Sequence, residues 1–174
     1  KEAIEHFSKI GNNVVEKNNN YLVYIHGIRG KLSKLNVLKN KHIPEIYLTS
    51  SMEQRTELLM GLMDTDGTVN KDRAMCEFTT VNKRLAEDVF TLCRSLGYKT
   101  TLIESDATLN GEFVSKKYRI HFVASKGDKV FKLDRKQERI NSKKAADRED
   151  KKRYFIQSVV PCGRHSVKCI TVEG

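Results

Sequence analysis

The stretch LLMGLMDTDGTV, residues 58–69, places Asp64 and Asp66 at the end of an apolar run that closes with Gly67. Ser51 and Gln54 form a capping-box pattern upstream, which predicts a helix from residue 51 to about residue 64, with Gly67 in the turn that ends it. The C-terminal end of a helix carries a partial negative charge, so carboxylates there are unfavourable. A local rule broken in this way is typical of a functional site.

A bound divalent cation would remove this electrostatic problem, because carboxylate oxygens are good ligands for magnesium and calcium. The Asp-Thr-Asp-Gly order does not fit an EF-hand loop, which needs a third Asx before its glycine and a glutamate at its twelfth position. Counted from Asp64, that position is Met75. The other interpretation is an acidic helix end solvated beside a glycine cap. The short motif by itself leaves both open.

The charge of the chain favours a polyanionic partner. The 174 residues include 32 Lys and Arg and 22 Asp and Glu, for a net charge of +10. Residues 116–153 contain 15 basic and 6 acidic side chains, and 15 − 6 gives +9 for this segment. Nucleic acid is the usual partner of such an excess, and a solvated basic surface is the alternative.

Composition also bounds the class of protein. Hydrophobic residues make up 39%, enough for one packed domain or a domain with a fragment. No apolar run approaches the roughly 18–20 residues of a membrane helix, and the polar start is unlike a secretory signal. The cysteines form no CxxC pair, and Cys76 and Cys93 fall within apolar patterns that predict small core residues. We therefore expect an intracellular, cytoplasmic protein in a reducing compartment.

The sequence around the motif predicts alternating helices and strands. Residues 76–81 have the pattern of a strand, and Asn82 caps a helix that ends at Gly97. Strands are predicted at 98–104 and 112–125, and a helix at 129–140. Residues 154–160 and 166–172 are short β-type runs around a turn at residues 161–163.

An internal repeat is visible. EAIEHFSKIG and NNVVEK, residues 2–17, resemble AEDVFTLCRSLG and YKTTLIE, residues 86–104. YLVYIHG, residues 21–27, resembles KYRIHFV, residues 117–123. Ile10 corresponds to Leu96, so the counterpart of Asp66 would lie before Lys1. The repeat predicts that the chain begins inside a first copy of the unit.

The motif residues 59–67, LMGLMDTDG, resemble the LAGLIDADG signature of homing endonucleases and retain its two leucines, two glycines and two aspartates. The flanking residues 41–69 and 81–89 are similar to the surroundings of the second such motif in inteins. The resemblance implies an α+β LAGLIDADG fold of αββαββα-type repeats with an antiparallel, saddle-shaped sheet. It divides the chain into a first-repeat remnant (1–48), the second repeat (49–140), a charged linker (141–152) and part of a C-terminal splicing segment of the Hedgehog/intein β fold (153–174).

The family also implies an activity: a magnesium-dependent endonuclease, or one that uses another divalent cation, which hydrolyses both strands of DNA at a long specific site. By resemblance Asp66 is the metal ligand, the carbonyl of Thr65 faces the metal, and Asp64 is structural support. Lys136, with Lys132 as second choice, matches the basic residue near the scissile phosphate. A plain surface charge is the alternative for each lysine.

Two further sets of residues follow from the resemblance. The motif helices of two repeats pack together, so Gly61 would permit close approach while Leu58, Leu59 and Leu62 fill the interface or the repeat core. His42 and Pro44 would fix the connection between repeats. The DNA-binding candidates are Glu77, Thr79, Lys117, Arg119, His121 and Arg135. A half-buried sheet with one wet face predicts the same alternation in its strands.

Residues 153–174 resemble the start of the last splicing segment of inteins, but the catalytic termini of splicing are absent from the sequence as written. We therefore expect an intein-derived chain that cannot splice by itself and whose natural context is a host protein that supplies exteins. One motif makes half an active site, so the partner is either the missing first repeat or a second copy of the chain. The alternatives are a non-cleaving DNA-binding module and a structural remnant of an intein. The DNA target and the host protein are not encoded in any recognisable pattern.

Overall fold

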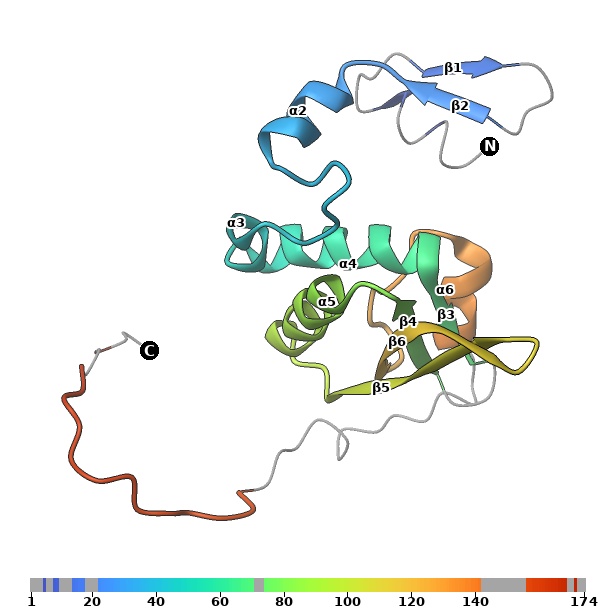
Figure 1. The fold of residues 1–174 in the computed structure, drawn as a ribbon. Coiled ribbons are helices and arrows are strands. Elements are labelled where there is room, and N and C mark those ends of the chain that lie inside the picture. The colour runs from blue at the N-terminus through green and yellow to red at the C-terminus, as the bar shows by residue number, and fades with distance from the viewer. Residues whose placement is uncertain are drawn as a thin grey trace.

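A four-stranded antiparallel sheet forms the centre of the protein in the computed structural model, which describes residues 5, 8–9, 14–17, 22–70, 74–141, 156–168 and 171 (Figure 1). The sheet has the strand order β3-β4-β6-β5. Its strands are β3 (Gly67–Val69), β4 (Met75–Thr80), β5 (Thr100–Leu109) and β6 (Glu112–Val123). The chain is therefore α+β, as the sequence predicted. The two middle strands, β4 and β6, are paired on both sides, and β3 and β5 are the edges.

The helices lie around this sheet. The motif helix α4 (Met52–Asp66) runs directly into β3, α5 (Lys83–Ser95) packs against β5 and β6, and α6 (Asp134–Asn141) packs against β3 (Figure 1). Both predicted N-caps are confirmed. Ser51 Oγ accepts the backbone N–H of Gln54 at 3.3 Å, and Asn82 Oδ1 accepts that of Leu85 at 3.0 Å. No described helix has the length and apolar character needed to span a bilayer.

Alternating strand residues and one face of each helix build a single core. From the sheet come Phe78, Ile120 and Phe122, and from the helices come Leu59, Met63, Val89 and Leu92, all at 2% exposure or less. Cys76 and Cys93 are fully buried free thiols, which confirms their predicted role as core residues. Burial raises the pKa of Cys76 to about 12 and that of Cys93 further in the same direction, so neither thiol is reactive near neutral pH.

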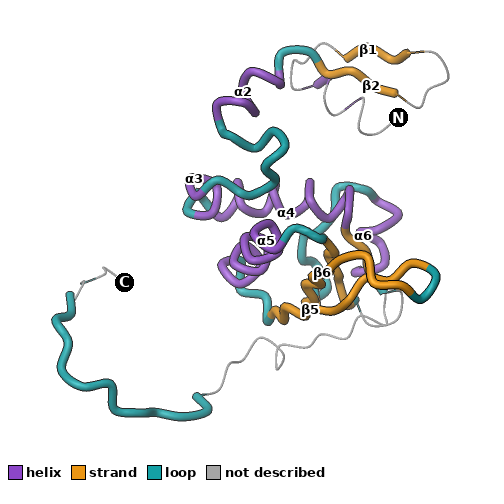
Figure 2. Tube along the Cα trace, viewed as in Figure 1, coloured by secondary structure: helices purple, strands orange, loops and turns teal. Residues whose placement is uncertain are grey.

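The N-terminal part contains a hairpin and two short helices. β1 (Val14–Lys17) and β2 (Leu22–Ile25) pair antiparallel, as the internal repeat predicted. The helices α2 (Ile28–Lys34) and α3 (Glu45–Leu48), which follow the hairpin in Figure 2, were not predicted. The connection at residues 41–44 is held to α5: Asp88 accepts the N–H of Ile43 at 2.8 Å, and Asn82 donates to the carbonyl of Lys41 at 3.0 Å. His42 and Pro44 flank this anchored position.

Three details of the motif region differ from the sequence prediction. The helix predicted at 129–140 begins only at Asp134, because side chains take the earlier backbone N–H groups: Gln137 Oε1 accepts those of Val130 and Phe131 at 3.2 and 3.0 Å. α4 runs to Asp66, two residues beyond its predicted end. Gly67 is extended, with φ −92° and ψ 154°, so it begins a strand and does not form a left-handed turn.

The strands predicted in the C-terminal tail are wrong for the residues that the structure describes. Residues 156–168 carry no strand and run away from the sheet as loop (Figure 2). A strand is stabilised by hydrogen bonds to a neighbouring strand, and residues 156–168 pair with no described strand. Their apolar side chains are exposed, with Ile156 at 85% and Val159 at 86%. Cys169, which the strand-like pattern of residues 166–172 predicts as a buried residue, lies outside the described residues.

The central strand β6 provides a test of this core. Ile120 is fully buried in it, whereas Val114 on the same strand is 62% exposed. We expect Ile120→Ala to lower the free energy of unfolding by about 2–5 kcal/mol, because it leaves a cavity, while Val114→Ala changes it by about 0.5 kcal/mol. Urea unfolding followed by circular dichroism measures both. Equal shifts in the two variants would contradict the assignment of the core.

Candidate functional site

The last residue of the motif helix, Asp66, is exposed where α4 meets the sheet. The next residue, Gly67, pairs with Phe78 of β4, so Asp66 directly precedes the first residue pair between β3 and β4. A Cβ on Gly67 would lie 2.6 Å from Cα of Met63 and 2.7 Å from its carbonyl oxygen, and only glycine allows this abrupt change from helix to strand. Within the described residues, no hydrogen bond or ion pair engages the Asp66 carboxylate. It is therefore available to a ligand.

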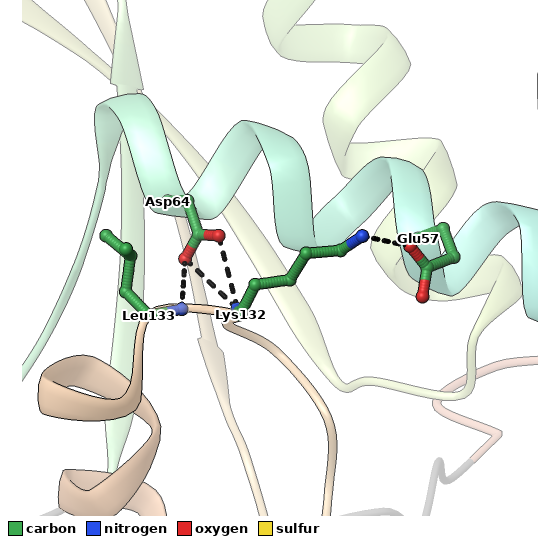
Figure 3. Close-up of polar contacts among 4 residues, drawn as sticks. All are labelled: Glu57, Asp64, Lys132 and Leu133. Carbon is green, nitrogen blue, oxygen red and sulfur yellow. Dashed lines mark hydrogen bonds and ion pairs between the residues drawn. The ribbon is translucent and has the colours of Figure 1, made fainter. Parts of the chain in front are cut away.

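The other motif aspartate, Asp64, is occupied. Its two oxygens accept the backbone N–H of Lys132, each at 3.2 Å, and one also accepts the N–H of Leu133 at 3.2 Å (Figure 3). These amides belong to the turn just before α6. A carboxylate near a helix N-terminus is favoured by the helix dipole. Asp64 is thus placed at an unfavourable end of its own helix and at a favourable end of α6.

Lys136 makes the reciprocal contact. It lies on α6, is 9% exposed, and its Nζ donates to the carbonyls of Met63, Asp64 and Gly67 at 2.9, 2.9 and 2.7 Å. The last carbonyls of a helix have no partner within the helix, and a cation there is favoured by the dipole. The three N–H groups of Lys136 thus bind three acceptors at the end of α4, of which the Met63 carbonyl also accepts the N–H of Gly67. We call these contacts of Asp64 and Lys136 the reciprocal clamp.

The clamp accounts for the acids at the end of α4. The ammonium of Lys136 lies against the carbonyls that would otherwise repel a carboxylate. Burial lowers the pKa of Lys136 below its usual value, and the neighbouring Arg135 adds to this, while Asp64 and Asp66 oppose it. The two acids thus help to keep a desolvated ammonium charged.

The side chain of Lys132 lies outside this clamp, although its backbone N–H belongs to it. Its Nζ forms an ion pair with Glu57 of α4, and in Figure 3 the side chain extends along the helix away from Asp64. Glu57 precedes Asp66 by nine residues, which is about 13 Å along an α-helix. The structure therefore brings Lys136 to the end of α4 and holds the ammonium of Lys132 farther back along it.

Five of the six predicted DNA-binding residues share the sheet face opposite the core. Glu77 pairs in register with His121, and Thr79 pairs with Arg119. The His121 Nε2 donates to Glu77 Oε2 at 2.6 Å, and the Thr79 hydroxyl donates to Glu77 Oε1 at 3.1 Å. Lys117 lies farther along the same face of β6. The sixth predicted residue, Arg135, is exposed on α6 and belongs to a different surface.

One face of α4 is open. Gln54, Leu58, Gly61 and Thr65 recur at spacings of four, three and four residues, which places them on the same side of the helix. They line a cavity of about 880 Å³ together with Glu5 and Lys9 of the N-terminal segment. A Cβ on Gly61 would meet nothing within 4 Å. We call this surface the open face of α4.

The leucines of the motif divide between this face and the core. Leu59 is fully buried in the core of the domain, so it is directed away from the open face. Leu58 and Leu62 are half-buried and pack against the same core from its margin. Of the four predicted interface residues, Gly61 and Leu58 thus line the cavity.

The ligand set is suited to a hard cation only in part. Asp66 supplies an exposed carboxylate, and the carbonyl of the preceding Thr65 is adjacent, while its hydroxyl donates to Leu62 O at 3.0 Å. Among the residues that the structure describes, no group of three or more His, Cys, Asp or Glu is assembled for a metal. Magnesium in proteins is commonly held by one or two carboxylates together with water and substrate phosphates. Asp66 fits as one of those carboxylates.

Two interaction partners in this region, Glu57 and the carbonyls bound by Lys136, are not predicted by the sequence. Glu57 is 75 residues from Lys132, and nothing local predicts their ion pair. The carbonyls that bind Lys136 are backbone atoms, and a residue pattern does not show which backbone atoms will be free. The lysine-rich composition of the segment was a signal for a cation, but it did not distinguish Lys132 from Lys136.

Comparison with known proteins agrees with this arrangement of motif helix and sheet. The model of the LAGLIDADG-like domain family matches residues 53–153, more than half of the chain. The chain therefore belongs to the LAGLIDADG-like domain family. It is also 38% identical over 146 residues to a protein described as replicative DNA helicase DnaB from Mycobacterium intracellulare. The match covers 84% of this chain and 25% of that relative, so the chain spans about a quarter of the relative's length.

The reciprocal clamp makes a prediction about stability. Lys136→Met removes the ammonium from three backbone carbonyls at the end of α4; the Met63 carbonyl keeps the N–H of Gly67, while those of Asp64 and Gly67 lose this donor. Each unsatisfied buried acceptor costs about 1–3 kcal/mol. We expect Lys136→Met to lower the free energy of unfolding by at least 2 kcal/mol or so. The exposed Lys129 provides the matched control, and Lys129→Met should change stability by about 0.5 kcal/mol or less. Urea midpoints that agree between the two variants would refute the clamp.

Proposed function

We propose that this chain is the DNA-cleaving domain of an intein inserted in a DnaB-type replicative helicase. The observation that carries the proposal is the end of α4, where a family motif delivers an unengaged carboxylate, Asp66, to the edge of an antiparallel sheet. The similarity to a DnaB protein supports the host, and the net charge of +10 supports a nucleic acid substrate. The proposed reaction is hydrolysis of phosphodiester bonds in double-stranded DNA at a long site.

Within this proposal Asp66 is the ligand of a magnesium ion or another divalent cation, with the Thr65 carbonyl beside it. When bound, the metal would activate a water molecule and stabilise the leaving oxygen. The chain itself fixes the position of Asp66, since Gly67 lies against Met63 and enters the sheet at once. The polar face of β4 and β6 would bind the DNA in front of this carboxylate.

Lys136 takes a positioning role in this proposal. All three of its N–H groups are directed at carbonyls of residues 63, 64 and 67, which bracket Asp66. A direct bond from this ammonium to a phosphate would cost one of those contacts. Lys136 therefore acts by fixing the backbone on both sides of Asp66 and by placing positive charge near the reacting phosphate. Lys132, bound to Glu57, supports the loop before α6.

The open face of α4 is the proposed contact with the second half of the site. A motif helix of the first repeat, or of a second copy of this chain, would lie against Gly61 and bring a second carboxylate close to Asp66. The first repeat is favoured, because Glu5 and Lys9 of the segment that resembles it already line the cavity. In the intact host, the apolar residues 156–168 would join the strands of the splicing domain.

A DNA-binding module that does not cleave is the second candidate. The observation behind it is the excess of basic side chains, which serves DNA binding with or without cleavage. The two candidates share the polar sheet face and differ in their dependence on the metal.

Substitution of Asp66 separates these candidates. In the full-length protein that contains this chain, we expect Asp66→Asn to reduce magnesium-dependent cleavage of the intein-free helicase gene by at least about 100-fold, with DNA affinity retained. Asp106→Asn removes an exposed carboxylate on β5 and should cleave like the wild type. Equal cleavage by wild type and Asp66→Asn would refute the role of Asp66. Binding without cleavage by the wild type would favour the second candidate.

The open face of α4 gives an independent prediction. Gly61→Leu should not destabilise this chain by itself, and the better helix propensity of leucine favours it by up to about 1 kcal/mol. The added side chain would nevertheless block an approaching helix. We expect the variant to lose association with the first repeat, or self-association, in analytical ultracentrifugation, and to lose cleavage. Gly30→Leu in α2, where a Cβ also meets nothing within 4 Å, is the matched control. Unchanged association in Gly61→Leu would show that the open face is not an interface.

A further inference from the structure

Arg119 occupies an interior position on the polar face of the sheet. It lies on β6, between Thr79 of β4 and Ile103 of β5 in the same row. Its neighbours along the strand on either side, Tyr118 and Ile120, are directed into the core, so Arg119 is directed to the opposite face. Because β6 is a middle strand, a molecule lying across this face would meet Arg119 at its centre and not at its rim.

The guanidinium of Arg119 lacks a partner for its inner N–H. Its Nε is buried with no hydrogen-bond acceptor among the described residues, and the hydroxyl of Ser105 on β5 is in the same state. These two atoms are the buried side-chain polar atoms without a partner in the described part of the chain, and both belong to the polar face. An unsatisfied buried donor costs about 1–3 kcal/mol, so a rotation of the Arg119 side chain that brings its Nε to an acceptor on a ligand is favoured.

The carboxylate within reach of Arg119 is already engaged. Glu77 is diagonal to Arg119 across β4 and β6, a separation that long side chains can span. One of its oxygens accepts from His121 and the other from Thr79. Both oxygens of Glu77 thus already have a donor, and among the described residues no hydrogen bond or ion pair joins Glu77 to Arg119.

A planar guanidinium in this state fits an acceptor with two adjacent lone pairs. DNA offers two such groups, the phosphate oxygens and the O6/N7 edge of guanine in the major groove. Phosphates line the margins of a bound groove, whereas base edges face the middle of the surface that enters it. The interior place of Arg119 favours the base.

We propose that Arg119 is a specificity-determining residue that recognises one guanine of the DNA target, and that His121 is a positioning residue that keeps Glu77 from neutralising it. This inference rests on the proposed DNA-binding function. It goes beyond that function by assigning one residue to one base and by giving the Glu77–His121 pair a role in recognition.

Selection of bound sequences from a randomised DNA library, with the full-length protein in the absence of divalent metal, tests the assignment. The wild type should select a motif that contains a fixed guanine. Arg119→Gln and Arg119→Lys should both lose that preference, because lysine keeps the charge and cannot form the two parallel bonds. Exchange of this G·C pair for C·G should weaken wild-type binding about tenfold and leave the Arg119→Gln variant nearly unaffected.

Lys117→Gln is the matched control, since it removes a charge from the same face of the same strand. It should weaken binding to all sequences alike and lower the salt dependence by about one phosphate contact, with the selected motif unchanged. If Arg119→Gln behaves in this way too, Arg119 contacts a phosphate and the inference is overturned.

His121→Gln tests the positioning role separately from folding. We expect His121→Gln to lose the guanine preference while its thermal unfolding stays normal. If the double variant His121→Gln, Glu77→Gln regains the preference, this supports neutralisation of Arg119 by Glu77 in the single variant. A preference that survives in His121→Gln would overturn this part. If the wild type binds no DNA at low salt, the proposed function fails, a result distinct from a motif that merely lacks dependence on Arg119.

Discussion

The exchange of charged side chains between α4 and α6 is the interaction on which the rest of the candidate site depends. The side chain of Asp64, near the end of α4, accepts hydrogen bonds from backbone amides just before α6. The side chain of Lys136, on α6, donates hydrogen bonds to backbone carbonyls at the end of α4. Each charge thereby lies at the end of a helix dipole where it is favoured. Two elements about 70 residues apart are joined by side-chain-to-backbone bonds, which require the backbone of both to be in place.

This exchange assigns different tasks to chemically similar residues. Asp64 and Asp66 are two positions apart, yet one has both oxygens occupied and the other is exposed. Lys132 and Lys136 are four apart, yet one lies against Glu57 and the other against the end of α4. The difference arises from where the backbone amides and carbonyls are unpaired. A site that presents a single open carboxylate beside a buried ammonium is the result.

The core of the domain is closed, whereas one side of its motif helix is open. Its core closes among α4, α5, α6 and the sheet, with Leu59 and Met63 directed inward. The opposite side of the same motif helix is open along Leu58, Gly61 and Thr65. The motif helix thus buries Leu59 and Met63 in the core of the domain and leaves Gly61 exposed on its other side.

Local sequence patterns were enough to predict the motif helix with its serine cap, the Asn82-capped helix, the alternating strands, the buried cysteines and the family, because each depends on neighbours a few residues apart. The sequence also singled out Asp66 and Lys136 as candidates, although their roles remain predictions. Only the folded chain shows which aspartate is open, which lysine reaches the end of α4, how late α6 begins, and that residues 156–168 form no strand. These outcomes depend on unpaired backbone groups that folding brings together from distant segments. The identity of a side chain does not reveal whether such a group will be there to receive it.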